Sequence, residues 1–483
     1  MAKDLRTFLT EYEKVFPGQV LRVDKEISAR YEITAFHKAL QRQNKFPIII
    51  FNNVITENGK KSKLPVITNL MASRERIAWS VGTTIKEASF HLAQRINMVK
   101  QKPVKIAKKD APVKQIKLRI PEDISLFDLP FVRHHALDGG PFGTGSMVMC
   151  IDPDSGNENF AFHRMNIWED NLSGVNMSPI SHIGSIQQKY ERMDKDMPCC
   201  VWFGYHPGGI MGGQTRMNLG DSHFEAMSAL LGEPIRTTDS ELYGSDFPVP
   251  ADAELILEGV IPANKRYPEG PFGEYPEYVG PQRWSPYFVA KCVTMKSDAL
   301  FHDIAVGTPD HQLAGCFGIE QMVYNMVKRV VPGIKNVYMP VSGCCRFHVY
   351  LQIQKTRKTD GREAILAAFL ADARIKHVFA FDEDIDIFNE KRVLWAIATR
   401  TQWDRDAMIV ERLSGAPWDP SALEAVTTKA GIDATLPLPT ESPFSIVIFS
   451  PTDVQEKINE DTLKNWVSQD VLDKIPYAKP GEV

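Results

Sequence analysis

The chain has 483 residues, of which 43% are hydrophobic and 24% are charged, and its formal net charge is −4 at neutral pH. These values are typical of a soluble globular protein, and the length predicts two or three domains. No block of Lys and Arg is long enough to predict a nucleic-acid-binding surface. No apolar run approaches the roughly 18 residues that a membrane-spanning helix needs.

The seven cysteines include the neighbouring pairs Cys199–Cys200 and Cys344–Cys345, but no C-x-x-C motif is present. An odd number of cysteines without a spacing framework predicts reduced thiols and argues against zinc ligation by cysteine. Residues 1–6 also lack the apolar segment of a signal peptide. We therefore expect a cytoplasmic protein.

Residues 1–115 alternate between helical and strand-like patterns, which predicts an α/β region. A serine at position 73 is placed to cap the helix that follows it. The expected helices are 5–15, 31–43, 74–79 and 84–99, and the expected strands are 19–23, 46–51 and 64–68.

Residues 116–317 contain many short apolar runs separated by Gly/Pro-rich loops, a pattern that favours a sandwich or barrel. A helix over 217–231 interrupts them. The glycine-rich segments 139–145 and 207–213 lack the spacing of known phosphate-binding loops. Taken alone, they are interpreted as tight β-turns.

An apolar-faced helix over 318–332 is expected to link this region to a second α/β domain, 333–483. In that domain the patterns predict strands at 347–353 and 377–381 and helices at 362–373 and 391–400. The acidic run Asp382–Asp386 lacks the glycine and bidentate glutamate of an EF-hand, so a strand-end loop is favoured. The tail from Asn459 is polar, is expected to be helical at first, and is long enough to lie across a partner subunit.

The segment 265–278 has the most specific chemistry. Prolines and two glycines surround Glu269 and Glu274, so the backbone is expected to be a shaped loop that follows a strand over 253–261. Bulky neighbours can desolvate one carboxyl, raise its pKa and make it a proton donor. Those neighbours are Tyr267, Phe272 and Tyr275. The alternative is an ordinary turn with exposed acids.

The stretch 156–167 alternates in part between apolar and polar side chains, as a half-buried strand does. Such a strand has Phe160, Phe162 and Arg164 on one face. Its other face has Asn159, Ala161 and His163. An arginine beside two phenylalanines is either a surface side chain or a buried anion clamp, and the pattern alone favours the surface.

His182 and Glu225 are imidazole and hard oxygen ligands of the kind that Mn²⁺ or Mg²⁺ accepts. No local spacing unites them with Asn159. For each of these residues taken alone, a core or surface role is the default interpretation.

Taken together and in order, several motifs between residues 64 and 420 resemble the UbiD family of decarboxylases, which use prenylated FMN. These motifs are Asn-Leu-Met-Ala-Ser-Arg-Glu-Arg (69–76), Pro-Gly-Gly-Ile-Met-Gly-Gly (207–213), Pro-Glu-Gly-Pro-Phe-Gly-Glu (268–274), Asp-Glu-Asp-Ile-Asp-Ile-Phe (382–388) and Leu-Trp-Ala-Ile-Ala-Thr-Arg (394–400). The resemblance implies a mixed α/β (α+β) fold: a split β-barrel flavin-binding domain at 116–317, a helix linker and an α/β C-terminal dimerisation domain.

The resemblance also assigns roles by motif. Arg164, Glu269 and Glu274 match the family's catalytic network. Asn159, His182 and Glu225 match the ligands of a divalent metal, Mn²⁺ or Mg²⁺, that holds the cofactor phosphate, often with K⁺ nearby. The backbone of the segment Ala161, Phe162, His163 and Arg164 is expected to lie along the flavin.

The implied reaction is the reversible, non-oxidative decarboxylation of an aromatic, heteroaromatic or α,β-unsaturated carboxylic acid. Glu274 is expected to donate the proton and Arg164 to hold the carboxylate. A flavin prenyltransferase would supply the cofactor, and the family implies a homodimer or hexamer. The alternatives are a non-catalytic flavin- or metal-binding protein and a metal-dependent hydrolase that uses His182 and Glu225.

Two segments bear on the substrate. The ferulic acid decarboxylase branch has a phenylalanine where this chain has Ala416, so a different pocket wall is expected unless Trp418 fills the space. The segment 307–315, which contains His311, resembles the branches that act on hydroxybenzoate and heteroaromatic acids. We therefore expect an acid with its carboxylate directly on a ring, ahead of cinnamic acid. The alternative is that His311 only braces its loop.

Overall fold

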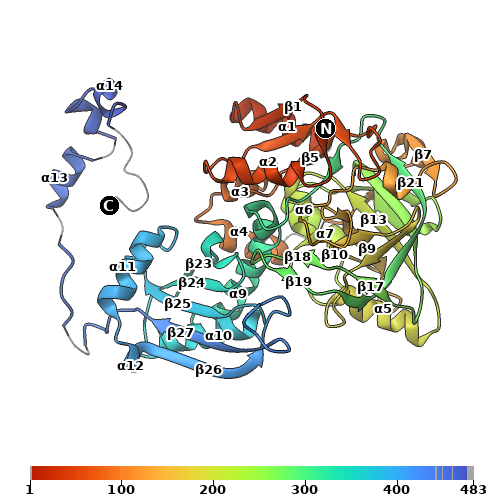
Figure 1. The fold of residues 1–483 in the computed structure, drawn as a ribbon. Coiled ribbons are helices and arrows are strands. Elements are labelled where there is room, and N and C mark those ends of the chain that lie inside the picture. Colours follow the sequence, from red (N-terminus) through yellow and green to blue (C-terminus); the bar gives the residue numbers. More distant parts are fainter. Residues whose placement is uncertain (1–2, 99–100, 441–442, 449, 460, 476–483) are drawn as a thin grey trace. The chain divides into compact units, whose positions relative to one another are not determined.

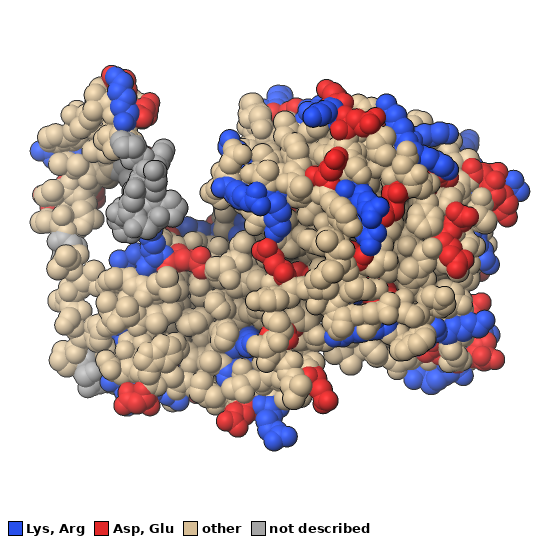
Figure 2. Space-filling view, in the orientation of Figure 1, with Lys and Arg blue, Asp and Glu red and all other residues tan. Residues whose placement is uncertain are grey.

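The computed structural model describes residues 3–98, 101–440, 443–448, 450–459 and 461–475 (Figure 1). The chain divides into two units, Met1–Thr435 and Leu436–Val483. Basic and acidic side chains are interspersed over the visible face of the first unit, as Figure 2 shows. Among the described residues, no helix combines the length and the apolar character that crossing a bilayer requires.

The N-terminal region builds a four-stranded mixed sheet in the order β1-β3-β5-β22, in which the last strand comes from much later in the chain. The helix predicted at 5–15 is confirmed, and Asp4 caps it by accepting a hydrogen bond from the Thr7 backbone N–H at 2.9 Å. The elements are α1 (Leu5–Val15), β1 (Val20–Val23), β2 (Ile27–Ser28), α2 (Glu32–Gln41), β3 (Ile48–Phe51), β4 (Val54–Ile55), β5 (Val66–Thr68), α3 (Arg74–Ser80), α4 (Ala88–Met98) and β22 (Phe301–His302).

The middle of the chain forms a nine-stranded antiparallel sheet, ordered β10-β9-β13-β16-β21-β12-β11-β8, with β7 also paired to β21. This half-barrel confirms the predicted split-barrel class. Its central strands are buried almost throughout, because other elements cover both faces. The strands are β7 (Ile116–Arg119), β8 (Phe142–Gly143), β9 (Met147–Ile151), β10 (Glu158–Phe162), β11 (Met165–Ile167), β12 (Leu172–Val175), β13 (Met197–Phe203), β16 (Leu255–Ile261) and β21 (Tyr287–Met295).

The glycine-rich segment predicted as a tight turn is instead a helix, α6 (Pro207–Gly213). A Cβ at Gly212 would lie 2.5 Å from the Met227 Cα, so glycine lets α6 pack directly on the backbone of α7 (His223–Leu231). Glycine is a poor helix former, and the sequence pattern therefore conceals this helix. The third helix of this region is α5 (His182–Arg192).

Smaller sheets complete the middle region. A three-stranded sheet has the order β15-β14-β6, and two hairpins pair β17 with β20 and β18 with β19. The predicted irregular loop at 265–278 therefore contains short strands. The elements are β6 (Val104–Lys105), η1 (Lys108–Asp110), η2 (Pro112–Lys114), η3 (Leu126–Asp128), β14 (Arg236–Ser240), β15 (Gly244–Pro250), β17 (Tyr267–Glu269), β18 (Phe272–Gly273), β19 (Val279–Gly280) and β20 (Arg283–Ser285).

The predicted linker helix is α9 (Cys316–Val330), which packs on α4 and on the five-stranded sheet β23-β24-β25-β27-β26 that follows it (Figure 1). Strands β24, β25 and β27 are parallel, as expected where helices connect them. The elements are α8 (Pro309–Leu313), β23 (Ile334–Tyr338), η4 (Val341–Gly343), β24 (His348–Ile353), α10 (Asp360–Ala371), β25 (His377–Asp382), α11 (Glu390–Arg400), α12 (Trp403–Asp406), β26 (Ala407–Ser414) and β27 (Val426–Asp433).

The described residues of the second unit form only short helices, α13 (Thr452–Lys457), η5 (Leu463–Asn465) and α14 (Gln469–Leu472). The helix predicted from Asn459 is thus a single 3₁₀ turn followed by α14, and residues 476–483 of that tail lie outside the described residues. The acidic run Asp382–Asp386 forms the end of β25 and the turn after it, as predicted.

Candidate active site

Arg164 lies at the bend between β10 and β11, where the chain leaves one edge of the half-barrel. Backbone and side-chain bonds hold this bend on both sides. The Ser146 hydroxyl donates to the His163 carbonyl at 2.6 Å, and the Asn176 N–H donates to the Arg164 carbonyl at 3.2 Å. The direction of the arginine side chain is therefore set by the sheet.

The two glutamates are placed by β17, β18 and the residues around them. The Gly273 N–H donates to Asp138 Oδ1 at 3.0 Å, and the Gly139 N–H donates to the Pro271 carbonyl at 2.9 Å. A Cβ at Gly139 would lie 2.4 Å from the Gly270 oxygen, so only glycine permits this close approach. Segment 138–139, from one of the predicted turn regions, thus clamps the glutamate loop.

Arg164 joins both carboxylates. Its Nε and Nη2 donate to Glu269 at 2.7 and 2.9 Å, and its Nη1 donates to Glu274. The side chain of Arg164 is 10% exposed, that of Glu269 is 0% exposed and that of Glu274 is 11% exposed. The surface position that the alternating pattern alone favoured for Arg164 is wrong, because the residue follows the end of β10 and turns inward onto the two acids.

The electrostatics of this cluster raise the pKa of Glu274. Burial raises the pKa of Glu274, against the opposing charge of Arg164, and the charge of Glu269 raises it further. The two carboxylates raise the pKa of Arg164 although burial opposes its charge. Because one cation beside two ionised acids leaves a buried net charge of −1, a proton on Glu274 makes the cluster neutral. The Arg164 guanidinium also lies 4.5 Å from the centre of the Phe272 ring.

The other candidate residues of this segment lie on β10 or, like His163, directly after it. Burial lowers the pKa of His163 to about 4 despite its bond to the Asn176 carbonyl. His163 Nδ1 lies 2.8 Å from that carbonyl oxygen, which can only accept a hydrogen bond, so Nδ1 carries the proton. Ala161 and Phe162 are half-buried, which leaves this segment accessible to a ligand on one side.

Glu158 connects β10 to the start of α7. Its carboxylate accepts hydrogen bonds from the Ser222 hydroxyl and, at 2.7 Å, from the Phe224 N–H. This places the first turn of α7, with Glu225, beside Asn159. The Asn159 amide nitrogen lies 3.4 Å from His223 Nδ1. Burial lowers the pKa of His182, so its imidazole is neutral and has a lone pair to offer.

The donors in this region suit a hard divalent cation chemically: an amide oxygen, a neutral imidazole and a carboxylate. Within the part of the chain that the structure describes, no three His, Cys, Asp or Glu side chains converge as a metal site. Asn159, His182 and Glu225 include only two residues of those types. His223 is a further imidazole here that the sequence did not single out.

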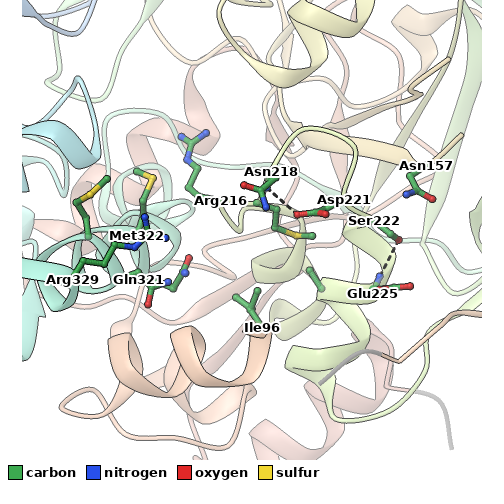
Figure 3. A pocket seen from close by; sticks show the side chains of 14 residues that line it. Ile96, Asn157, Arg216, Asn218, Asp221, Ser222, Glu225, Gln321, Met322 and Arg329 are labelled. Atoms are coloured by element: carbon green, nitrogen blue, oxygen red, sulfur yellow. Dashed lines mark hydrogen bonds between the residues drawn. The ribbon is translucent and has the colours of Figure 1, made fainter. Parts of the chain in front are cut away.

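A cavity of about 710 Å³ opens beside these residues, between α4, α7 and α9 (Figure 3). Its volume is within the range of pockets that hold cofactors. Asn157 and Glu225 are among its lining residues, and Arg216 projects from its wall. Six residues lie between Asn157 and Arg164, five of them in the extended strand β10, which is a span of roughly 20 Å. An elongated ligand can therefore follow β10 from this cavity to the ion cluster.

The predicted substrate residues differ in their packing. His311 stacks on Tyr275, with ring centres 3.8 Å apart, and Trp418 packs on the same tyrosine at 5.4 Å. Tyr275 directly follows Glu274 in the chain, and it brings the other two rings close to this part of the site. Ala416 is buried, and Trp418 also contacts Phe347 at 5.4 Å. His311 Nδ1 accepts a bond from the Gly307 N–H at 3.4 Å, which is a bracing contact.

Comparison with family models matches nearly the whole first unit. Residues 16–96 match the 3-octaprenyl-4-hydroxybenzoate carboxy-lyase N-terminal domain, 104–309 match the Rift-related domain of the same family (UbiD), and 312–434 match its C-terminal domain.

Curated relatives cover most of the chain. The anhydromevalonate phosphate decarboxylase of Methanothermobacter thermautotrophicus is 31% identical over 430 residues, which are 89% of this chain and 97% of the relative. The phenolic acid decarboxylase of Bacillus subtilis is 30% identical over 456 residues, which are 91% of this chain and 94% of the relative.

Solved structures of UbiD-class enzymes are similar throughout. The enzyme HmfF from Pelotomaculum thermopropionicum, in complex with FMN, has a TM-score of 0.86 and 32% identity and covers 96% of this chain and 100% of its own. An evolved dimeric form of HmfF in complex with prFMN has a TM-score of 0.83 and 31% identity, with coverages of 96% and 100%.

Proposed function

The chain belongs to the UbiD family of decarboxylases, and on that premise we propose that it catalyses the reversible, non-oxidative decarboxylation of an aromatic, heteroaromatic or α,β-unsaturated acid with prenylated FMN. Arg164 is the proposed carboxylate clamp and Glu274 the proposed proton donor. The observation that carries this proposal is the buried arrangement in which one guanidinium joins two carboxylates.

The hydrogen-bond inventory of Arg164 supports its role. A guanidinium has five N–H donors. Three of them are used by the two glutamates, which leaves one on Nη1 and one on Nη2. These two N–H groups are available to donate to a substrate carboxylate. Arg164 can therefore hold a substrate without releasing Glu269.

The position of Glu274 supports its role as the acid. Loss of CO₂ leaves an electron pair on carbon, and a proton must replace the lost group. Glu274 binds the same guanidinium as the proposed substrate carboxylate, and its raised pKa favours the protonated form. A negatively charged substrate at Arg164 strengthens that preference, because it adds a second anion next to Glu274.

Prenylated FMN and a metal complete the proposal. Asn159, His182 and Glu225 would hold Mn²⁺ or Mg²⁺ and, through it, the cofactor phosphate, with K⁺ nearby, and the cavity beside Glu225 has room for the cofactor. The segment Ala161–Arg164 would lie along the flavin. The bound cofactor would accept the electrons released as CO₂ departs.

The aromatic residues near Glu274 support a ring-bearing acid. Tyr275, His311 and Trp418 form a continuous stack on which a planar substrate can pack. Burial keeps the pKa of His311 well below its usual range, so the ring is neutral. Because Nδ1 accepts from the Gly307 N–H, Nε2 carries the proton and can donate a hydrogen bond to a ring substituent. We propose that the preferred substrate has its carboxylate attached directly to the ring, and that cinnamic acid is a poorer substrate.

The proposal is tested with protein produced together with a flavin prenyltransferase, the enzyme that would supply the cofactor. CO₂ release and ester hydrolysis are measured side by side on benzoic, hydroxybenzoic, furoic, indole-carboxylic, naphthoic and cinnamic acids and their esters. We expect CO₂ release, accompanied by product H/D exchange in D₂O, only from protein that contains prenylated FMN. Full turnover by cofactor-free protein would contradict the cofactor assignment, and cinnamate as the clear best substrate would contradict the ring preference.

A further inference from the structure

Arg346 is a buried charge without a carboxylate partner. It is 1% exposed. Its Nη1 donates to two backbone carbonyls, those of Gln312 at 3.0 Å and Cys345 at 2.7 Å, and its Nε has no partner. Among the described residues, no ion pair includes Arg346, which follows the η4 turn.

Several other arginines with little exposure are neutralised by acids: Arg74 donates to Glu320 at 2.7 Å, Arg374 binds Asp372, and Arg164 binds two glutamates. The buried Arg76 is an exception, because it donates only to the backbone carbonyls of Asn69 and Phe46. A buried cation that lacks such a partner is strongly unfavourable, and carbonyl dipoles compensate only part of the cost. The free N–H groups of Arg346 are therefore suited to an anion that arrives with a ligand.

The surroundings of Arg346 place such an anion next to the proposed substrate. The Arg346 guanidinium lies 4.6 Å from the centre of the Tyr275 ring, which also stacks on His311 with ring centres 3.8 Å apart. His311 is within electrostatic range of both Arg346 and Arg164. A ring that packs on the Tyr275–His311–Trp418 stack can therefore have one arginine near each end.

Space and charge at Arg346 also favour an anion. A Cβ at Gly315 would lie 3.1 Å from Arg346 Nη2 and 3.4 Å from Gln214 Oε1, so the glycine keeps the space beside Nη2 open. Arg374, burial and Arg346 together lower the pKa of Arg216 to about 10, a sign of excess positive charge. The negative charge of Asp372 has the opposite effect and raises the pKa of Arg216.

We propose that Arg346 binds a second anionic group of the substrate, a carboxylate or a phosphate, at the end of the molecule away from the carboxylate that Arg164 holds. This inference rests on the proposed function and names its substrate class: a dianionic acid. Arg346 supplies the charge and three N–H groups, one on Nε and two on Nη2, and Tyr275 packs against its guanidinium.

The test is calorimetric titration of the cofactor-loaded protein with benzoate, terephthalate, isophthalate and 4-carboxyphenyl phosphate. We expect at least one dianion to bind about tenfold or more tightly than benzoate, since hydrogen bonds to charged groups are the strong ones. The terephthalate and phosphate arms distinguish the two kinds of second anion. Arg346→Gln should abolish the preference, and Arg346→Lys should retain part of it.

Arg400→Gln is the matched control, because Arg400 is equally buried but already paired with Asp384, and it should keep the preference. Equal affinity of the wild-type protein for all four probes, or an unchanged preference in Arg346→Gln, would overturn the inference. Loss of flavin without a change in preference would also overturn it, by assigning Arg346 to the cofactor. CO₂ release is scored separately: a dianion preference without decarboxylation of any acid would refute the proposed function and leave the anion site standing.

Discussion

Glu269 accepts two hydrogen bonds from Arg164, from Nε at 2.7 Å and from Nη2 at 2.9 Å, whereas Glu274 accepts one from Nη1. The two-point contact fixes the plane of the guanidinium, and the fully buried Glu269 cannot exchange protons easily with solvent. Glu274 is held at one point and is partly exposed. This asymmetry separates the two acids into a residue that orients Arg164 and a residue that transfers a proton.

We predict that Glu274→Gln lowers kcat by roughly 10²-fold or more, the usual effect of removing a general acid. H/D exchange of the product should be blocked as well, whereas flavin content should stay at the wild-type level. Glu277→Gln is the control, since Glu277 is in the same loop but is exposed and paired with Lys38 at 2.8 Å. Normal H/D exchange in Glu274→Gln would show that the proton comes from another group.

The pH dependence of catalysis should respond to the neighbours of Glu274. The acid form of Glu274 is lost as pH rises through its raised pKa, so kcat should fall on the alkaline side. Glu269→Gln removes a negative charge that raises this pKa, and the alkaline limb should move to lower pH. Arg283→Gln removes a positive charge that lowers the pKa of Glu274, so the alkaline limb should move to higher pH. This shift should be smaller than the one in Glu269→Gln, because Arg283 is exposed to solvent.

Rate–pH profiles of the three proteins measure these shifts. Movement of both variants in the same direction, or no movement in Glu269→Gln, would contradict Glu274 as the titrating acid. The KM for the acid should also rise in Glu269→Gln, because Arg164 loses its fixed orientation.

Substitution of the proposed metal ligands should lower the amount of bound cofactor rather than the turnover of the enzyme that still holds it. We predict that Glu225→Ala, His182→Ala and treatment with EDTA each lower the flavin-to-protein ratio and the bound Mn²⁺, read from absorbance and elemental mass spectrometry. Glu191→Ala is the control, because Glu191 is on the same helix as His182 but pairs with Arg266 at 2.7 Å. Full flavin and metal content together with abolished turnover would assign Glu225 and His182 to the reaction itself.

The fold was predictable where local patterns agree with tertiary packing. Helix 5–15 has an N-cap and a continuous apolar face, and the linker helix has the same kind of face before Pro332. Helix α6 was missed because its seven residues include four glycines, which allow it to pack closely on α7. Such a helix is stabilised by backbone packing and has no periodic apolar pattern that the sequence would reveal.

The site was predictable only through the family motifs. Nothing local connects Arg164 with Glu269, which is 105 positions later, and the alternating pattern alone placed Arg164 on the surface. His223 and Arg346 were missed for a related reason. The first is one of several buried histidines, and the second follows a cysteine pair with no recognisable spacing, so their surroundings exist only in the folded chain.

The last prediction concerns stability at low pH. His206 packs against Phe8 at 5.2 Å and caps α6 by accepting a bond from the Gly208 N–H at 3.1 Å. Burial, with a smaller effect of Lys3, lowers its pKa to about 3, from an ordinary value of 6.5. The unfolded chain therefore binds a proton below pH 6.5 that the folded chain does not bind until near pH 3. Stability is complete above pH 6.5 and falls as the pH decreases through that window.

Between pH 7 and pH 5 this one residue should cost about 2 kcal/mol of unfolding free energy. His206→Asn keeps a capping oxygen and removes the titration, so the difference between urea unfolding at pH 7 and at pH 5 should shrink by about that amount. Phe8→Leu is the control: it should lower stability at both pH values and leave the difference unchanged. An unchanged pH dependence in His206→Asn would mean that the buried imidazole is not a source of acid sensitivity.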